Sequence, residues 1–283
     1  MINSKTSSLL LSAALLLPFS SIVNAWTVNA NFENQKPGDK CKGLASTESR
    51  IVANQGANGS NACKQSINAK ETGFGKWGGI INLPTKLSNG DELWIRVRTF
   101  MPKGFNYNST TGGNRLKFLR VKTMTTSGGN VGYNDWYINP SSNKTPFSFI
   151  YEGRQDLAWN HVGTNKDKIK LGQWETYEYY IKFDTRSVKE GGTGRMRAWK
   201  NGNLMSDMTD RVTLKNSDNI ASALYIFTYW NGGSPKSQNM LIDDIVVTNQ
   251  KPSNRDKSGN PYIGAGSLSA APPIAAPLPP SLD

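Results

Sequence analysis

The chain has 283 residues, with 33 Lys and Arg against 21 Asp and Glu, so its formal charge near neutral pH is +12. This length suits one large all-β domain or two small domains. Two cysteines and one histidine exclude a zinc shell built from these residue types.

The first 25 residues have the parts of a secretory signal peptide in their usual order. A lone Lys5 precedes an apolar run from Leu9 to Leu17, and small residues end the segment at Val23-Asn-Ala25. The run is too short to span a bilayer. We therefore predict cleavage after Ala25 and a secreted or periplasmic protein, the alternative being a buried N-terminal helix.

No later segment is apolar enough to predict a membrane span. An exported basic protein does not meet nucleic acid as its normal partner. The charge instead favours an anionic polysaccharide, a cell surface or lipid headgroups. The alternative is that the basic residues only aid solubility.

The two cysteines, Cys41 and Cys63, lie close to the mature N-terminus in surroundings rich in Gly, Asn and Ser. In an oxidising compartment such a pair forms a disulfide. We predict a Cys41–Cys63 bond that contributes about 3 kcal/mol by constraining the unfolded chain.

Period-two alternation of apolar residues recurs along the chain, and helical periodicity is nearly absent. The predicted strands are 94–100, 115–122, 147–151, 176–183, 195–199, 223–230 and 240–248. The turn signals between them are Asn89-Gly-Asp, Thr111-Gly-Gly, Ser127-Gly-Gly, Glu190-Gly-Gly, Asn201-Gly-Asn and Asn231-Gly-Gly. The pattern predicts an all-β antiparallel sandwich or barrel over residues 26–250.

Residues 251–283 differ in composition from the rest, being first polar and then rich in Pro and Ala. Such a segment cannot build a core of its own. We predict a disordered tail or a linker, with an extended segment packed against the domain as the alternative.

The stretch YIFTYWNGGSP, residues 225–235, carries rings on both faces of a predicted strand. Strict alternation puts Tyr225, Phe227 and Tyr229 on one face and Trp230 on the other. One face then belongs to the core, and the other faces a second protein layer or a ligand that stacks on rings.

Several segments together resemble one family. They are NFENQKPGD, GDELWIRVRTFMPKGF, RLKFLRVK, GQWETYEYYIKFDT, GRMRAWKNGNLM, YIFTYWNGGSP and LIDDIVVTN, spread over residues 26–249. They are similar to the concanavalin A-like jelly-roll polysaccharide lyases related to heparin and glucuronan lyases, and more loosely to lectins and glucanases of that fold. The resemblance implies an antiparallel two-sheet jelly roll in which one sheet forms a glycan groove.

Cations alternate with rings on several predicted strands, as binding of an acidic sugar chain requires. Arg forks match carboxylate or sulfate groups, and rings stack on the apolar faces of sugars. Solvated faces also carry Arg and Lys, so each single residue has this alternative interpretation. The candidate substrate-binding residues are Arg96, Arg98, Glu152, Arg154, Arg197, Trp199, Trp230 and Asn231.

A retaining glycan hydrolase needs two carboxylates about 5 Å apart. The Glu-x-Asp-x-x-Glu spacing of the related glucanases is missing, and Glu175 and Glu178 fall on opposite faces of their strand. Hydrolysis is therefore disfavoured, although Glu152 could act with a carboxylate from another strand.

A lyase needs a base for the C5 proton of a uronate, a cation or amide for the neighbouring carboxylate and an acid for the leaving oxygen. The candidates are Tyr229 and His161 for proton transfer and Lys117 and Arg120 for the carboxylate. His161, the single histidine, lies in a predicted polar loop. The alternative is that it takes no part in catalysis. The ring-rich segment 132–136 is also predicted as a loop.

The ends of the domain carry a third candidate site. Glu33 near the first strand, and Asp243 and Asp244 in the last, resemble the paired terminal strands of carbohydrate-binding jelly rolls, which implies a structural calcium. The alternative for these acids is a salt bridge to Lys or Arg. No organic cofactor is expected.

The leading hypothesis is an exported, monomeric lyase that cleaves an acidic, uronate-containing polysaccharide by β-elimination. A lectin-like protein with the same groove and no competent base is the first alternative. An envelope structural or adhesion protein, with the Pro-rich tail as connector, is the second.

Overall fold

The structure, a computed structural model, describes residues 24–44, 48–73, 77–107, 115–139, 146–154 and 160–265. Most of the predicted signal peptide, the Thr111-Gly-Gly turn and residues 266–283 lie outside the described residues. Within the described part of the chain, no helix has the length and apolar character needed to cross a membrane.

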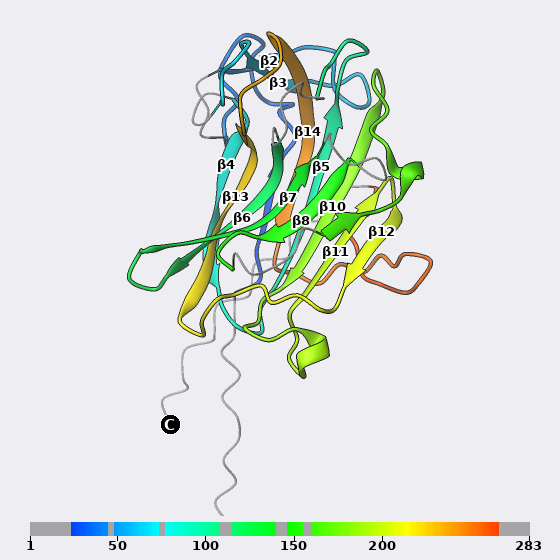
Figure 1. The fold of residues 1–283 in the computed structure, drawn as a ribbon. Coiled ribbons are helices and arrows are strands. Elements are labelled where there is room, and N and C mark those ends of the chain that lie inside the picture. The colour runs from blue at the N-terminus through cyan, green and yellow to red at the C-terminus, as the bar shows by residue number, and fades with distance from the viewer. Residues whose placement is uncertain are drawn as a thin grey trace, which may run out of the picture.

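Two antiparallel sheets pack face to face (Figure 1). Sheet A has the order β12-β11-β10-β5-β14-β3-β2, with β1 also paired to β14. Its strands are β1 (Thr27–Ala30), β2 (Ser49–Val52), β3 (Ala62–Ile67), β5 (Glu92–Phe100), β10 (Trp174–Lys182), β11 (Arg195–Lys200), β12 (Asn203–Met208) and β14 (Gln238–Thr248).

Sheet B has the order β4-β13-β6-β7-β8-β9. Its strands are β4 (Gly79–Leu87), β6 (Leu116–Thr125), β7 (Asn130–Ile138), β8 (Phe147–Tyr151), β9 (Asn160–Val162) and β13 (Asn219–Trp230). Two short 3₁₀ helices, η1 (Asn165–Asp167) and η2 (Val188–Glu190), complete the described elements. The predicted all-β antiparallel sandwich is confirmed.

The core between the sheets is rich in rings. Phe118 of β6 packs edge-on against Tyr177 of β10, with ring centroids 5.1 Å apart, and Trp136 of β7 packs against Tyr179, also of β10. Inward residues alternate with outward ones except at β-bulges, so each sheet keeps an outer face whose composition is independent of the core.

A β-bulge in β13 changes the facing predicted for its rings. The register against β6 shifts between Ile226 and Tyr229, and Phe227 has a left-handed φ of 49°. The extra residue turns Phe227 into the core beside Trp77 while Tyr225 and Tyr229 stay half-buried on the outer face. The prediction that Phe227 shares a face with Tyr225 and Tyr229, made from strict alternation, was therefore wrong.

Glycine at position 78 permits this bulge. Its φ is +75°, and a Cβ there would lie 2.1 Å from the carbonyl oxygen of Ile226 and 2.5 Å from that of Phe227. Only a residue without a side chain fits so close to a neighbouring backbone.

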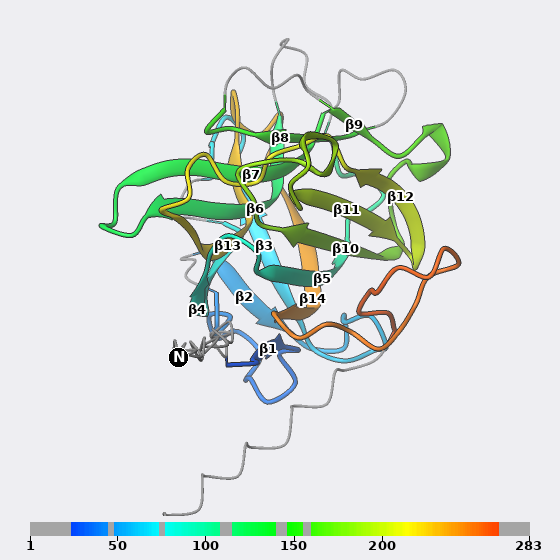
Figure 2. The same cartoon turned by 90° about the horizontal axis from the view of Figure 1, so that it is seen from below.

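The polar segment after β14 packs on the outer face of sheet A (Figure 2, orange). Ile263 is 1% exposed and belongs to a second apolar cluster with Trp94, Tyr180 and Trp199. The packed part of the chain therefore extends past residue 250 to Gly264, against the domain as in the alternative interpretation, although Arg255 and Pro261 pair across a turn and the segment is not extended throughout. We call residues 252–265 the strap.

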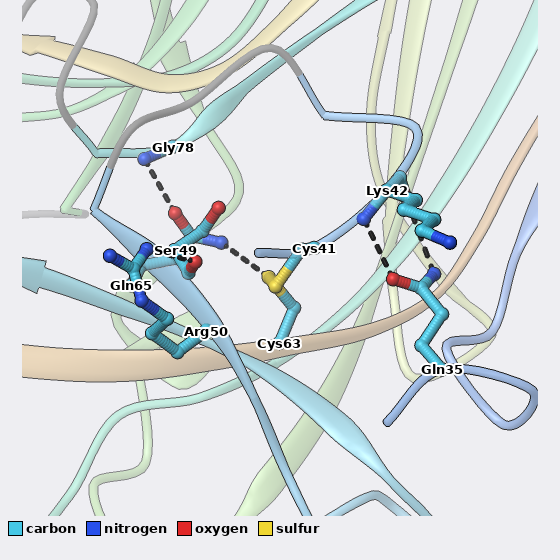
Figure 3. Close-up of a disulfide and its surroundings, with 8 residues drawn as sticks. All are labelled: Gln35, Cys41, Lys42, Ser49, Arg50, Cys63, Gln65 and Gly78. Carbon is cyan, nitrogen blue, oxygen red and sulfur yellow. Dashed lines mark hydrogen bonds between the residues drawn. A yellow bond between two sulfur atoms is a disulfide. The ribbon is translucent and has the colours of Figure 1, made fainter. Parts of the chain in front are cut away.

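The predicted disulfide between Cys41 and Cys63 is present (Figure 3). It ties the loop after β1 to β3, with the two Cα atoms 5.9 Å apart. Gln65, two residues along β3, donates to Cys63 Sγ and accepts the backbone N–H of Gly78 at 2.7 Å. Through Gln65, the disulfide is thereby connected to Gly78, which lies against the bulge of β13.

Candidate functional site on the outer face of sheet B

A row of polar side chains crosses the outer face of sheet B. The strand registers pair Tyr229 with Lys117, Lys117 with Tyr137, Tyr137 with Ser148, and Ser148 with His161. Paired residues share a face, so all five point outward. With about 4.8 Å between strands, the row extends over roughly 19 Å.

A second row runs beside the first and contains Tyr225, Arg120 and Asp135 in register. A register shift between Lys117 and Leu119 places Arg120 on the outer face although Phe118 and Leu119 are both in the core. This bulge brings two cations that are three residues apart to the same side of the sheet.

Two cations and two carboxylates form an ionic cluster at the centre of this face. Lys117 Nζ lies 2.8 Å from Asp135 Oδ2 and also contacts Glu152 Oε1. Arg120 donates from Nε to Asp135 Oδ2 at 3.0 Å and from Nη2 to Glu152 Oε2 at 2.6 Å. We call Lys117, Arg120, Asp135 and Glu152 the charge quartet.

Burial affects the two acids of the quartet differently. Burial raises the pKa of Asp135, whose side chain is fully buried, and the Arg120 and Lys117 cations oppose that rise. Glu152 is also desolvated, but Lys117 and Arg120 together outweigh this and hold its pKa below the usual range. Glu152 is therefore a carboxylate at neutral pH.

Tyrosine rings hold the cations in place. Lys117 Nζ lies 5.2 Å from the centroid of the Tyr137 ring, and the Arg120 guanidinium lies 3.8 Å from that of Tyr133. Tyr133 also packs edge-on against Tyr225 at 5.5 Å. Each cation is thus fixed by ion pairs on one side and by a ring on another.

The structure brings together three of the four predicted catalytic residues. Tyr229 is directly across from Lys117, and Arg120 follows on the same strand face. His161 shares the face but stands at the far end of the row, on the edge strand β9 rather than in a loop, with its side chain exposed. Tyr229 and His161 are too far apart to act on one proton.

Sequence reasoning missed Asp135, Tyr133 and Tyr137. Segment 132–136 was predicted as a loop, but it belongs to β7. The alternation of Tyr133, Asp135 and Tyr137 was the signal for a strand with one polar face, and Gly132 obscured it.

Four predicted substrate-binding residues lie on the opposite sheet. Arg96 and Arg98 of β5 and Arg197 and Trp199 of β11 point to the outer face of sheet A. Arg98 pairs with Asp244 at 2.8 Å, and Arg197 donates to Asp207 at 3.0 Å. None of the four lies on the face of the charge quartet.

The strap covers part of this second face. Trp199 is 1% exposed and donates its indole N–H to Asp256 at 2.8 Å, while Arg96 donates to the carbonyl oxygen of Gly264 at 2.6 Å. Next to the strap end is a hollow of about 410 Å³ lined by Asn58, Arg96, Arg98, Thr176, Asp244, Gly264 and Ala265.

Of the remaining predicted binding residues, only Glu152 lies in the quartet. Trp230 is fully buried and stacks on Trp77 at 6.0 Å, so it belongs to the core and not to the outer face. Asn231 is half-buried in the turn after β13, and Arg154 is half-buried after the turn that follows β8.

The acids predicted to hold calcium separate into two environments. Asp244 takes the alternative role, a salt bridge with Arg98. Asp243 is buried, and no cation pairs with it among the described residues; burial, with Asp244 and Glu33 adding to the effect, raises its pKa to about 6. Asp243 accepts N–H of Ala57, and Glu33 accepts N–H of Asn61, in the same loop.

The fold, two stacked antiparallel sheets, is similar to that of solved jelly-roll polysaccharide lyases. The chain is similar to alginate lyase Aly36B, solved as a mutant in complex with alginate trisaccharide, at 17% identity over 80% of this chain and 99% of that chain, with a TM-score of 0.55. Another complex of that enzyme has a lysine and a tyrosine replaced by alanine and contains alginate tetrasaccharide.

The endo-β-1,4-glucuronan lyase of the fungus Trichoderma reesei is similar at 12% identity over 76% of this chain and 94% of that chain, with a TM-score of 0.54. Cellulose induced protein Cip1 matches at 12% identity over 84% of this chain and 100% of that chain, with a TM-score of 0.52. The expected resemblance is thereby confirmed as a likeness of fold. No protein-family model matches the sequence, and no curated protein matches it either.

Proposed function

We propose that this protein is an exported polysaccharide lyase that cleaves an acidic, uronate-containing polysaccharide by β-elimination. The observation that carries the proposal is the placement of Tyr229 on an outer face directly across from Lys117, with Arg120 beside them. Structures of the same fold include lyases for alginate and glucuronan. The lysine and tyrosine substituted in the alginate complex are the same residue types as Lys117 and Tyr229.

The chemistry assigns one role to each group. The uronate carboxylate lies against Lys117 and Arg120, which stabilise the negative charge that builds on it as the C5 proton leaves. Tyr229 takes that proton and returns one to the departing C4 oxygen. The electron pair of the C5–H bond forms the C4–C5 double bond as the C4–O bond breaks.

Hydrolysis is less well supported by the same residues. Asp135 is the carboxylate from another strand with which Glu152 could act, but its side chain is fully buried and cannot reach a sugar. A retaining or inverting pair needs both carboxyl groups at the glycosidic bond.

The test is a substrate screen over alginate, glucuronan, heparin-type and pectic polysaccharides, following the ultraviolet absorbance of the unsaturated uronate. Cleavage with rising absorbance of at least one polymer is expected. Depolymerisation without absorbance would mean hydrolysis. Binding without any cleavage, unchanged in Tyr229→Phe, would establish the lectin-like alternative, and absence of all glycan binding would favour the adhesion protein.

We also propose that Glu33 and Asp243 contribute to a structural calcium site. A buried acid without a cationic partner is costly, and a divalent ion would offset that cost. The described residues contain no cluster of three or more metal-binding side chains, so backbone and amide oxygens would have to complete the shell. Adding a chelator is expected to lower the Tm and calcium to restore it; a Tm indifferent to both would exclude the site.

A further inference from the structure

The two acids of the charge quartet differ in how freely they can move. Asp135 lies within β7 and its side chain is 0% exposed, whereas Glu152 follows the last residue of β8 and is 30% exposed. The Glu152 backbone is held, since its N–H donates to the carbonyl oxygen of Tyr133 at 3.0 Å. Glu152 can therefore leave the cluster by rotating its side chain alone.

The contacts of the quartet divide the cation donors in two sets. Asp135 takes one donor of Lys117 and the Nε of Arg120 from the buried side. Glu152 places one carboxylate oxygen on Lys117 Nζ and the other on Arg120 Nη2, from the side nearer to solvent. A carboxylate that bridges a lysine and an arginine in this way has the contacts that a uronate carboxylate needs at the same pair.

The rest of the cluster does not need Glu152 to stay ordered. Asp135 and the rings of Tyr137 and Tyr133 hold Lys117 and Arg120 from other directions. With Glu152 in place, two cations face two carboxylates, so the quartet is neutral. When Glu152 leaves, one positive charge is uncompensated, which a substrate carboxylate can neutralise.

We propose that Glu152 occupies the position of the substrate carboxylate in the resting site and is displaced by it. This inference rests on the proposed function. It makes Glu152 a residue that determines specificity: a neutral glycan offers no group to replace it on the two cations, and a uronate does. It also keeps Lys117 and Arg120 paired while the site is empty.

The test is calorimetric binding of a saturated oligouronate, taken from the polymer that binds or is cleaved, to the wild type and to Glu152→Gln. The amide keeps the shape but loses the charge, so the Kd is expected to fall about tenfold or more, the value of one charge-assisted contact. The fall should be seen in KM rather than kcat. An unchanged or higher Kd would overturn the inference and leave the proposed function standing.

Asp207→Asn is the matched control. Asp207 also bridges two arginines, Arg195 and Arg197, at 23% exposure, but on sheet A, and its Kd should equal that of the wild type. If Glu152→Gln fails to fold, Glu152→Asp, which keeps the charge and shortens the reach, should show the same tighter binding. If neither the wild type nor any variant binds a uronate oligomer of the screened polymers, this inference and the proposed function both fall.

Discussion

The outer faces of the two sheets contain similar residues and differ in which groups pair with their charged side chains. On sheet B, Lys117, Arg120 and Asp135 are buried and pair with one another and with Glu152, which is 30% exposed, next to half-buried tyrosines. Sheet A presents Arg96, Glu178 and Trp199 beneath the strap, whose backbone satisfies the charged groups. Arginine next to an aromatic ring on a strand therefore does not distinguish a ligand face from a face that binds the protein's own chain.

The largest expected difference between the two faces is catalytic. Tyr229→Phe should lower kcat on the cleaved polymer by about 10²–10⁴, because it removes the group that transfers the proton. Tyr180→Phe removes a tyrosine hydroxyl from the sheet A face, where it donates to Glu92 at 2.7 Å, and should leave kcat within about twofold. Tyr229→Phe with more than a tenth of the wild-type kcat would remove Tyr229 from the mechanism.

The next difference concerns the stability of the two charge clusters. Asp135→Asn should lower the free energy of unfolding by about 3–5 kcal/mol, since it leaves two buried cations without their fixed partner. Asp207→Asn, in a more exposed cluster, should cost less than about 1 kcal/mol. Urea denaturation measures both, and equal losses would show that burial does not distinguish the clusters.

The strap should make stability depend on pH through Glu178. Burial raises the pKa of Glu178 to about 7, against 4.5 in the unfolded chain, although backbone N–H groups of Ile263 and Gly264 and the charge of Arg96 oppose the rise. Between these values the folded state keeps a proton that the unfolded state has lost, so stability falls as pH rises from about 4.5 to 7. The shift corresponds to a free energy on the order of 3 kcal/mol.

Urea melts at pH 4.5 and pH 7.5 measure this effect as the difference between the wild type and Glu178→Gln. Relative to the variant, the wild type should lose stability at the higher pH. A difference that stays constant with pH would mean that Glu178 titrates normally beneath the strap.

The smallest expected effect tests whether the strap is separate from the site. Ile263→Ala removes most of a buried side chain and should cost about 2 kcal/mol, with faster hydrogen exchange in residues 252–265. The kcat should be unchanged because the strap lies on the other sheet. A parallel loss of kcat would show that the two faces are coupled.

The sequence predicted several features of the fold correctly from local chemistry. The strand 147–151 agrees with β8 residue for residue, and the turn after Asn201 and the Cys41–Cys63 bond are present. Alternation and turn residues are local signals, so they can be recognised in the sequence without knowing which strands are neighbours. Segment 132–136 was wrongly predicted as a loop, because a glycine within a strand resembles a loop signal.

The candidate site was predictable only in part. Lys117, Arg120, Tyr229 and Glu152 were named from residue type, but their grouping depends on bulges in β6 and β13 that alternation does not reveal. The bulge in β13 also turns Phe227 into the core. An equally clear pattern of cations and rings occurs on the other sheet, at Arg96, Arg98, Arg197 and Trp199. No local sequence signal shows that residues 252–265 pack over that face.

The sequence by itself determined that this protein is a basic, antiparallel β-sandwich with one disulfide, because alternation, turn chemistry and cysteine count depend on neighbouring residues. Only the tertiary structure decided which residues meet on each outer face. Strand order, two bulges and the strap set that outcome, and each depends on contacts between residues far apart in the chain. The rings of YIFTYWNGGSP separate accordingly: Tyr229 lies across from a cation on the outer face of sheet B, and Phe227 and Trp230 fill the core.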